Sequence, residues 1–168
     1  VLLRRGASDA IGILAWALLP AIAWWYFGEP RTLLVLVGAL GLALLLRANW
    51  TWNRILLSSV ALGLVYGFVL GAVFREPIEA MAGELQKLLP TMFDGAHQQL
   101  SVGERERLEA LIAPVLTGLL AALLQILSLL SLILGRYWQA VLYNPGGFGR
   151  EFRALRLSLP QALLLLSL

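Results

Sequence analysis

Four long apolar runs constrain this chain more than any other feature of its sequence. They cover residues 9–27, 32–46, 55–74 and 110–134, and after Asp9 none of them contains Asp, Glu, Lys, Arg or His. Runs of about 20 apolar residues are typical of helices that span a bilayer. In hydrocarbon each backbone polar group must be paired within its own segment, so we expect α-helices. No run shows the alternation of a membrane β-strand.

The composition agrees with a membrane protein. Apolar residues make up 60% of the 168 positions, charged residues make up 14%, and the mean hydropathy is +0.80. A domain that folds in water needs more polar groups to cover its surface. The sequence therefore predicts an all-α, polytopic transmembrane bundle, with residues 1–168 forming a single membrane domain. The chain has no cysteine, which excludes disulfides and thiolate metal sites.

The flanks of the runs predict where the helices stop. Gly28 and Pro30 should end the first helix, and the last should begin near Ser101 and continue to about Tyr143, before the breaker at residues 144–147. The apolar stretches at residues 1–3 and 159–168 look like parts of further helices. We expect about six spanning helices in a longer protein, four of them complete here.

Arginine placement predicts the orientation of the bundle. One set of flanks holds Arg4, Arg5, Arg47, Arg54, Arg136, Arg150, Arg153 and Arg156. The opposite set is residues 75–109, which are net acidic, and the turn near residue 30. Cytoplasmic loops of membrane proteins are enriched in arginine and lysine. We therefore expect a multi-pass protein of the bacterial inner membrane with residues 75–109 on the periplasmic side.

Residues 75–109 have the pattern of an amphipathic helical hairpin inserted between two spanning helices. Apolar residues recur at helical spacing from Ile78 to Met92, and acids occupy the other faces. The hairpin could pack on top of the bundle, or it could form a lid over a cavity or a docking surface. His97 is the single histidine, so no metal site is expected.

A stripe of small residues runs along the third apolar run. It consists of Ser59, Gly63, Gly67 and Gly71, four residues apart. Such a stripe lets a second helix backbone approach closely. It predicts either tight packing inside the bundle or docking against another membrane protein subunit.

Polar residues within the runs are few and uncharged. Proton relays and ion-coupled transporters usually place ionisable side chains near the middle of the bilayer, and this chain has none there. Trp24, Tyr66 and Gln125 could line a pocket for a small neutral molecule. In the alternative interpretation these residues are core, and the serines hydrogen-bond to carbonyls of their own helices.

The predicted inner loop combines aromatic and basic residues. Phe148 should dip into the membrane interface, while Arg150, Arg153 and Arg156 meet lipid phosphates or hold a cytosolic partner. Its glycines lack the lysine of a phosphate-binding P-loop. The arginines lie in short flanks rather than along one face, so no nucleic-acid binding is expected.

The chain resembles a known family at several short motifs. These are Leu18-Leu19-Pro20, Trp24-Trp25-Tyr26-Phe27-Gly28, Phe74-Arg75-Glu76-Pro77 and the run from Tyr143 to Gly149. They resemble the YybS-like family of bacterial inner-membrane proteins. That family is distantly similar to the membrane-embedded substrate-binding subunits of energy-coupling-factor transporters. The resemblance implies a six-helix bundle with an outward-opening ligand pocket and a small-residue face for a coupling subunit. The resemblance assigns no ligand-binding residue to this chain.

These patterns lead to two hypotheses about function. The first is an integral inner-membrane protein without catalytic chemistry or cofactor that acts as a small-molecule binding or transport-type subunit. The second is a structural or assembly subunit of a larger membrane complex. No nucleophile–base pair, acid pair or metal set indicates an enzyme. The expected partners are the lipid bilayer, other membrane protein subunits and a small neutral ligand.

Overall fold

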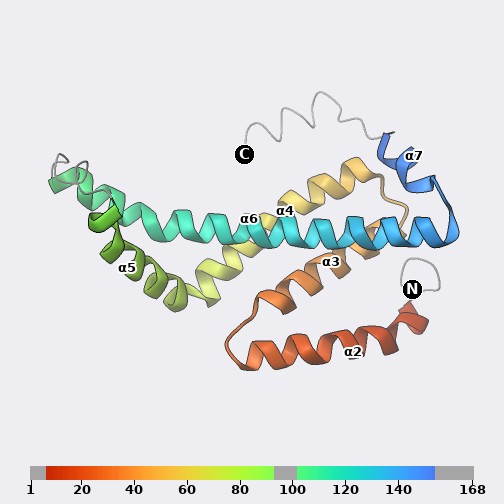
Figure 1. The fold of residues 1–168 in the computed structure, drawn as a ribbon, viewed down its shortest axis with the longest axis horizontal. Helices are drawn as coiled ribbons and strands as arrows, with labels where there is room; N and C mark the ends of the chain where they lie inside the picture. The colour runs from red at the N-terminus through yellow and green to blue at the C-terminus, as the bar shows by residue number, and fades with distance from the viewer. Residues whose placement is uncertain (1–6, 93–101, 154–168) are drawn as a thin grey trace. The chain divides into compact units, whose positions relative to one another are not determined.

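All regular elements in the described part of the chain are α-helices. The structure, a computed structural model, describes residues 7–92 and 102–153. Figure 1 shows six helices, whose bounds are α2 Ala7–Tyr26, α3 Arg31–Arg47, α4 Trp52–Val73, α5 Arg75–Met92, α6 Val102–Tyr143 and α7 Gly147–Arg153. The predicted all-α class is confirmed. The bounds of α2, α3 and α4 agree with the predicted apolar runs to within a few residues, and α6 ends at Tyr143, as predicted for the last helix.

Two helices end in the same capping motif. After α2, the N–H of Gly28 donates to the carbonyl of Trp25 (2.9 Å) and that of Glu29 to Trp24 (3.0 Å). This is the Schellman pattern, which requires a left-handed residue, and Gly28 has φ 85°.

After α3 the same pattern places Asn49 at φ 61°. The N–H of Asn49 donates to Leu46 and the N–H of Trp50 to Leu45. Asparagine tolerates this conformation better than most residues. The motif turns the chain directly into α4.

The long helix α6 ends at a tight turn. The N–H of Gly147 donates to the carbonyl of Asn144 (2.9 Å), and Gly146 has φ 81°. Proline at the second position and a glycine with positive φ at the third are typical of a type II turn. The turn reverses the chain, so that α7 folds back toward the end of α6 (Figure 1).

The chain divides into two compact units, which are described separately. Unit 1 contains α2, α3, the beginning of α4, the second half of α6, and α7. Within it, α2 and α3 pack against each other as a helical hairpin (Figure 1). Its core is a cluster of Leu42, Trp52, Ile55 and Leu132, against which Phe148 packs. Three helices and α7 therefore meet at this end of unit 1.

Unit 2 contains the end of α4, all of α5 and the first half of α6. Ile78 and Ala82 of α5 are buried. The side-chain amide of Gln86 donates to the carbonyl of Glu109 (3.2 Å), which ties α5 to α6. The predicted amphipathic helix is thus present and is attached to its neighbour on one face.

Most of the apolar surface of the long helices faces outward. Among the described residues, two helices are long and apolar enough to cross a membrane, Trp52–Val73 and Gly103–Tyr143. Only 22% of the apolar window of each is buried. The sequence predicts four complete spans, whereas the described apolar stretch of α2, Ile11–Tyr26, and the helix α3 are shorter than these two.

Several predictions fall on residues outside the described ranges. They concern the terminal stretches 1–3 and 159–168, Arg156, His97, the cap at Ser101 and the tip of the hairpin within residues 75–109.

Candidate functional site

The small-residue stripe of α4 packs against α6 within unit 1. Ser59 is buried, and its hydroxyl donates to the carbonyl of Leu56 in its own helix (2.7 Å). Gly63 lies directly against the side chain of Gln125. A methyl group added at Gly63 would lie 2.9 Å from Cδ of that side chain, closer than ordinary packing allows. A larger residue at position 63 would therefore require the side chain of Gln125 to shift.

In unit 2 the stripe continues, with looser packing. A methyl group at Gly67 would lie 3.8 Å from Cβ of Ala121, an ordinary contact distance. At Gly71 no atom lies within 4 Å of the added methyl group. The stripe thus changes from a packing surface to an open surface toward the end of α4.

Gly71 lines an open hollow of about 660 Å³ in unit 2. All three helical segments of the unit contribute to its wall. The lining residues are Gly67, Gly71, Arg75, Ile78, Glu79, Ala110, Ala113, Pro114, Thr117 and Gly118. The space exists because half of these residues are glycine or alanine, whose side chains are too small to fill it.

The hollow carries little free charge. Arg75 Nε donates to Glu79 Oε1 at 2.7 Å, so the two charged lining groups pair with each other. The hydroxyl of Thr117 donates to Ala113 of its own helix (2.8 Å). Pro114 lies inside α6 and has no N–H to donate to the carbonyl of Ala110. The site therefore combines a neutral wall with one backbone carbonyl deprived of its usual helical donor.

The three residues of the sequence-predicted pocket are not in the lining of this hollow. Trp24 of α2 is 56% exposed, and Tyr66 of α4 is buried. Gln125 is half-buried beside Gly63 in unit 1, and its side chain makes no hydrogen bond within the described residues. Ser128 and Ser131 donate to the carbonyls of Leu124 and Leu127, as the alternative interpretation expects.

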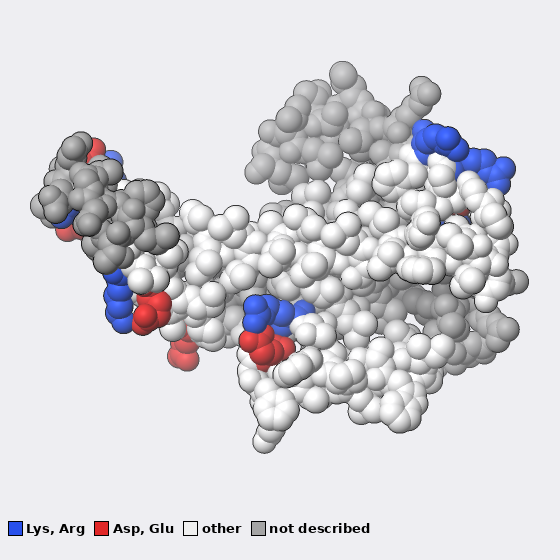
Figure 2. Space-filling view, in the orientation of Figure 1, with Lys and Arg blue, Asp and Glu red and all other residues white. Residues whose placement is uncertain are grey.

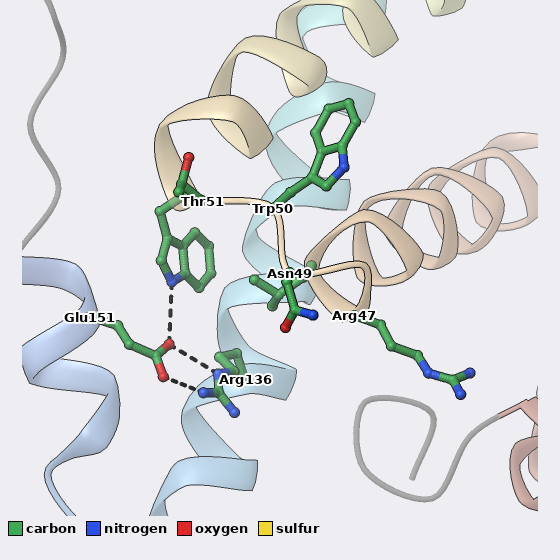
Figure 3. A pocket seen from close by; sticks show the side chains of 8 residues that line it. Arg47, Asn49, Trp50, Thr51, Arg136 and Glu151 are labelled. Carbon is green, nitrogen blue, oxygen red and sulfur yellow. Dashed lines mark hydrogen bonds and ion pairs between the residues drawn. The ribbon is translucent and has the colours of Figure 1, made fainter.

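A second hollow, of about 390 Å³, lies at the arginine-rich end of unit 1. Its wall includes an ion pair between Arg136 of α6 and Glu151 of α7, shown in Figure 3. Arg136 donates through Nε to Oε2 of Glu151 (3.1 Å) and through Nη2 to Oε1. Its Nη1 donates to Gln139 (2.9 Å), and the indole N–H of Trp52 donates to Glu151 (3.3 Å). The network joins α4, α6 and α7.

The network keeps Glu151 ionised. Partial burial would raise the pKa of its carboxyl, but the hydrogen bonds from Arg136 and Trp52 and the charge of Arg136 outweigh it, so the pKa lies below its usual value. Arg136 and Glu151 therefore form a neutral pair at neutral pH.

Aromatic rings surround this network. Phe148 lies 5.9 Å from Tyr137, 6.2 Å from Trp52 and 5.3 Å from Phe152, measured between ring centroids. The contacts with Tyr137 and Trp52 are edge-on, a geometry that favours one fixed arrangement, and the contact with Phe152 is tilted. Phe148, predicted to contact lipid or a partner, thus packs inward against unit 1.

The two described arginines of α7 point outward. Arg150 and Arg153 are exposed, and Figure 2 shows the blue patch that arginine side chains form over this helix. Arg153 Nε also donates to the carbonyl of Gly149 (3.1 Å). Their contact with lipid or a partner stays a prediction.

Sequence reasoning singled out Gly67 and Gly71 of one hollow and Arg47 and Arg136 of the other, but it predicted neither hollow and missed most of the other lining residues. The small residues of α6 from Ala110 to Gly118, interrupted by Pro114, were a readable signal for open space. The pairing of Arg136 with Glu151 depends on the turn after Tyr143 and has no signal in spacing alone. Among residues 7–92 and 102–153, no group of three or more His, Asp or Glu side chains is placed to hold a metal ion.

Comparisons of the chain with protein-family models, with curated proteins and with solved structures found no match. The resemblance to the YybS-like family therefore stays a prediction.

We expect Gly63→Ala to be less favourable than Gly71→Ala by up to about 1 kcal/mol, because the new methyl group forces the flexible side chain of Gln125 to shift. Thermal unfolding in neutral detergent measures the change. Gly71→Ala, which adds the same group in open space, is the matched control and should change little. Gln125→Ala should remove most of the cost when combined with Gly63→Ala. Equal costs at Gly63 and Gly71, or no rescue, would contradict the packing described here.

Glu151→Gln should lower stability at pH 7 by about 1 kcal/mol, since it removes a partly exposed ion pair. A carboxyl whose pKa is lowered by folding stabilises the protein above its unfolded pKa of about 4.3, and this contribution is lost as pH falls through the folded pKa. The difference between wild type and variant should therefore shrink toward about pH 3. Unfolding temperatures measured across this pH range test it, and a difference that grows on acidification would contradict the assignment.

Proposed function

We propose that the chain is a multi-pass membrane protein in which α2, α3, α4 and α6 span the bilayer. The support is the apolar surface that α4 and α6 leave uncovered, with 22% of each apolar window buried. A core helix of a water-soluble protein would be mostly buried. In this proposal the hydrocarbon covers the outward side chains, and α5 lies on the periplasmic side, with the arginine-rich end of unit 1 in the cytoplasm.

Within that membrane protein we propose a small-molecule binding or transport-type function. The observation that carries it is the hollow of about 660 Å³ in unit 2, lined by α4, α5 and α6. Pockets of about 300–1,000 Å³ hold small ligands in other proteins. The amphipathic helix α5 forms one wall, which agrees with the idea of a ligand held beneath an outer helix.

The chemistry of the wall favours an uncharged ligand with a hydrogen-bond donor. Arg75 and Glu79 neutralise each other, so a charged ligand would have to break this pair. The carbonyl of Ala110 receives no helical hydrogen bond from residue 114, because Pro114 has no N–H. In this proposal it accepts a hydrogen bond from an N–H or O–H of the ligand. The glycines and alanines supply close apolar contact.

The alternative is a structural or assembly subunit that docks other membrane proteins. The sequence feature that suggested docking is the small-residue stripe of α4. Gly63 and Gly67 of this stripe, however, already lie against Gln125 and Ala121 of α6. These contacts favour the packing interpretation over docking at those two positions. The outward apolar faces of α2 and α6 remain available to lipid or to a partner.

Single cysteines test the proposed orientation, because the chain has none of its own. Glu84→Cys on α5 and Arg150→Cys on α7 both replace exposed side chains. In intact cells a membrane-impermeant maleimide should label the first variant, and it should label the second only after lysis. Labelling of both from the same side would overturn the topology.

Filling the hollow tests the binding function. Gly71→Leu should remove any small molecule that co-purifies with the wild type, because the leucine occupies the space above α4. Mass spectrometry of compounds released from equal amounts of protein gives the measurement. Gly41→Leu, on an open surface of α3 outside the hollow, is the control and should retain the compound. A wild type that carries no small molecule, or equal retention by both variants, would count against the function.

A further inference from the structure

The hollow of unit 1 offers hydrogen-bond donors that nothing in the described chain uses. Its wall consists of Leu46, Arg47, Asn49, Trp50, Thr51, Trp52, Arg136 and Glu151. Trp52, Arg136 and Glu151 satisfy one another through the network described above. The side chains of Arg47, Asn49, Trp50 and Thr51 make no hydrogen bond or ion pair within the described residues. In Figure 3, Arg47 extends away from the Arg136–Glu151 pair.

The charge around this hollow is strongly unbalanced. Arginines 47, 54, 136, 150 and 153 lie in its wall or within three residues of it, against the single carboxylate of Glu151. Glu151 is already used by Arg136. The remaining arginines make no ion pair among the residues described, which leaves an excess of positive charge that attracts an anion.

The same wall is also aromatic and apolar. Leu46 belongs to the apolar run of α3, and Trp50 is 39% exposed. Tryptophan is enriched at the membrane–water interface, where its ring lies at the level of the headgroups. A free anion would gain nothing from these residues, whereas a lipid has both a charged headgroup and apolar chains.

We propose that this hollow binds the headgroup of an anionic phospholipid. The guanidinium of Arg47 pairs with the phosphate, for which its fork of donors is well suited. The amide of Asn49, fixed by the left-handed turn at φ 61°, donates a second hydrogen bond. The neutral Arg136–Glu151 pair forms the rigid wall, and the acyl chains follow the apolar surface that begins at Leu46. A volume of about 390 Å³ is adequate for a headgroup. The site is separate from the hollow of unit 2 and does not depend on its function.

Native mass spectrometry of the purified full chain in neutral detergent tests the site. Phosphatidylglycerol and phosphatidylcholine with the same acyl chains are titrated in parallel. We expect the wild type to bind phosphatidylglycerol more tightly, and Arg47→Gln to weaken that binding about tenfold, since a charge-assisted hydrogen bond is lost. Asn49→Gly should weaken it about fivefold without changing the net charge, because glycine keeps the positive φ and removes only the amide.

Arg31→Gln is the matched control. It removes one arginine from the opposite end of the same helix, where Arg31 pairs with Glu29, and should change the affinity less than about twofold. Equal losses for Arg31→Gln and Arg47→Gln would show a general charge effect and overturn the site. Unchanged binding by Arg47→Gln and Asn49→Gly, or equal affinity for phosphatidylcholine, would do the same. If inorganic phosphate competes as strongly as the lipid, the ligand of this site is a soluble anion and the lipid proposal is overturned.

Discussion

The two long apolar helices of the described residues, α4 and α6, bury little of their apolar surface, and this limits the surroundings in which they are stable. Only 22% of the apolar window is buried in α4 and in α6. Since burial of apolar area is the main stabilising contribution to folding in water, such helices would be poorly stabilised there. Helices that pair their own backbone groups are stable in hydrocarbon without that burial. The membrane proposal therefore follows from the unburied surface as much as from helix length.

The helices could be predicted from local signals in the sequence. The contacts between distant residues could not. Gly28, and the turn from Asn144 to Gly147, end helices by backbone conformation, which a sequence reveals directly. Asn49 was missed because asparagine is a weaker left-handed signal than glycine. The ion pair of Arg136 and Glu151 requires the direction in which α7 leaves its turn, and the hollow of unit 2 requires knowing which small residues stay uncovered. Both are properties of packing rather than of any local pattern.

The two hollows differ in how their charges are balanced. In unit 2, Arg75 and Glu79 neutralise each other, and what is left is a neutral wall of small residues. In unit 1, Arg136 is neutralised by Glu151, but Arg47 and its neighbours are not. The excess positive charge favours an anionic ligand in the hollow of unit 1, and the paired charges favour an uncharged ligand in the hollow of unit 2. The two proposals therefore assign ligands of different charge to the two hollows.

The stripe of α4 shows why a single sequence pattern cannot be given a single role. At Gly63 the absence of a side chain makes room for Gln125, so replacement would force that side chain to move. At Gly71 the same absence leaves space that no described residue fills. A docking partner would need an exposed run of small residues, and contact with α6 already covers the part of the stripe at Gly63 and Gly67. The stripe therefore serves helix packing at one end and forms part of a cavity wall at the other, which favours the binding hypothesis over assembly through this face.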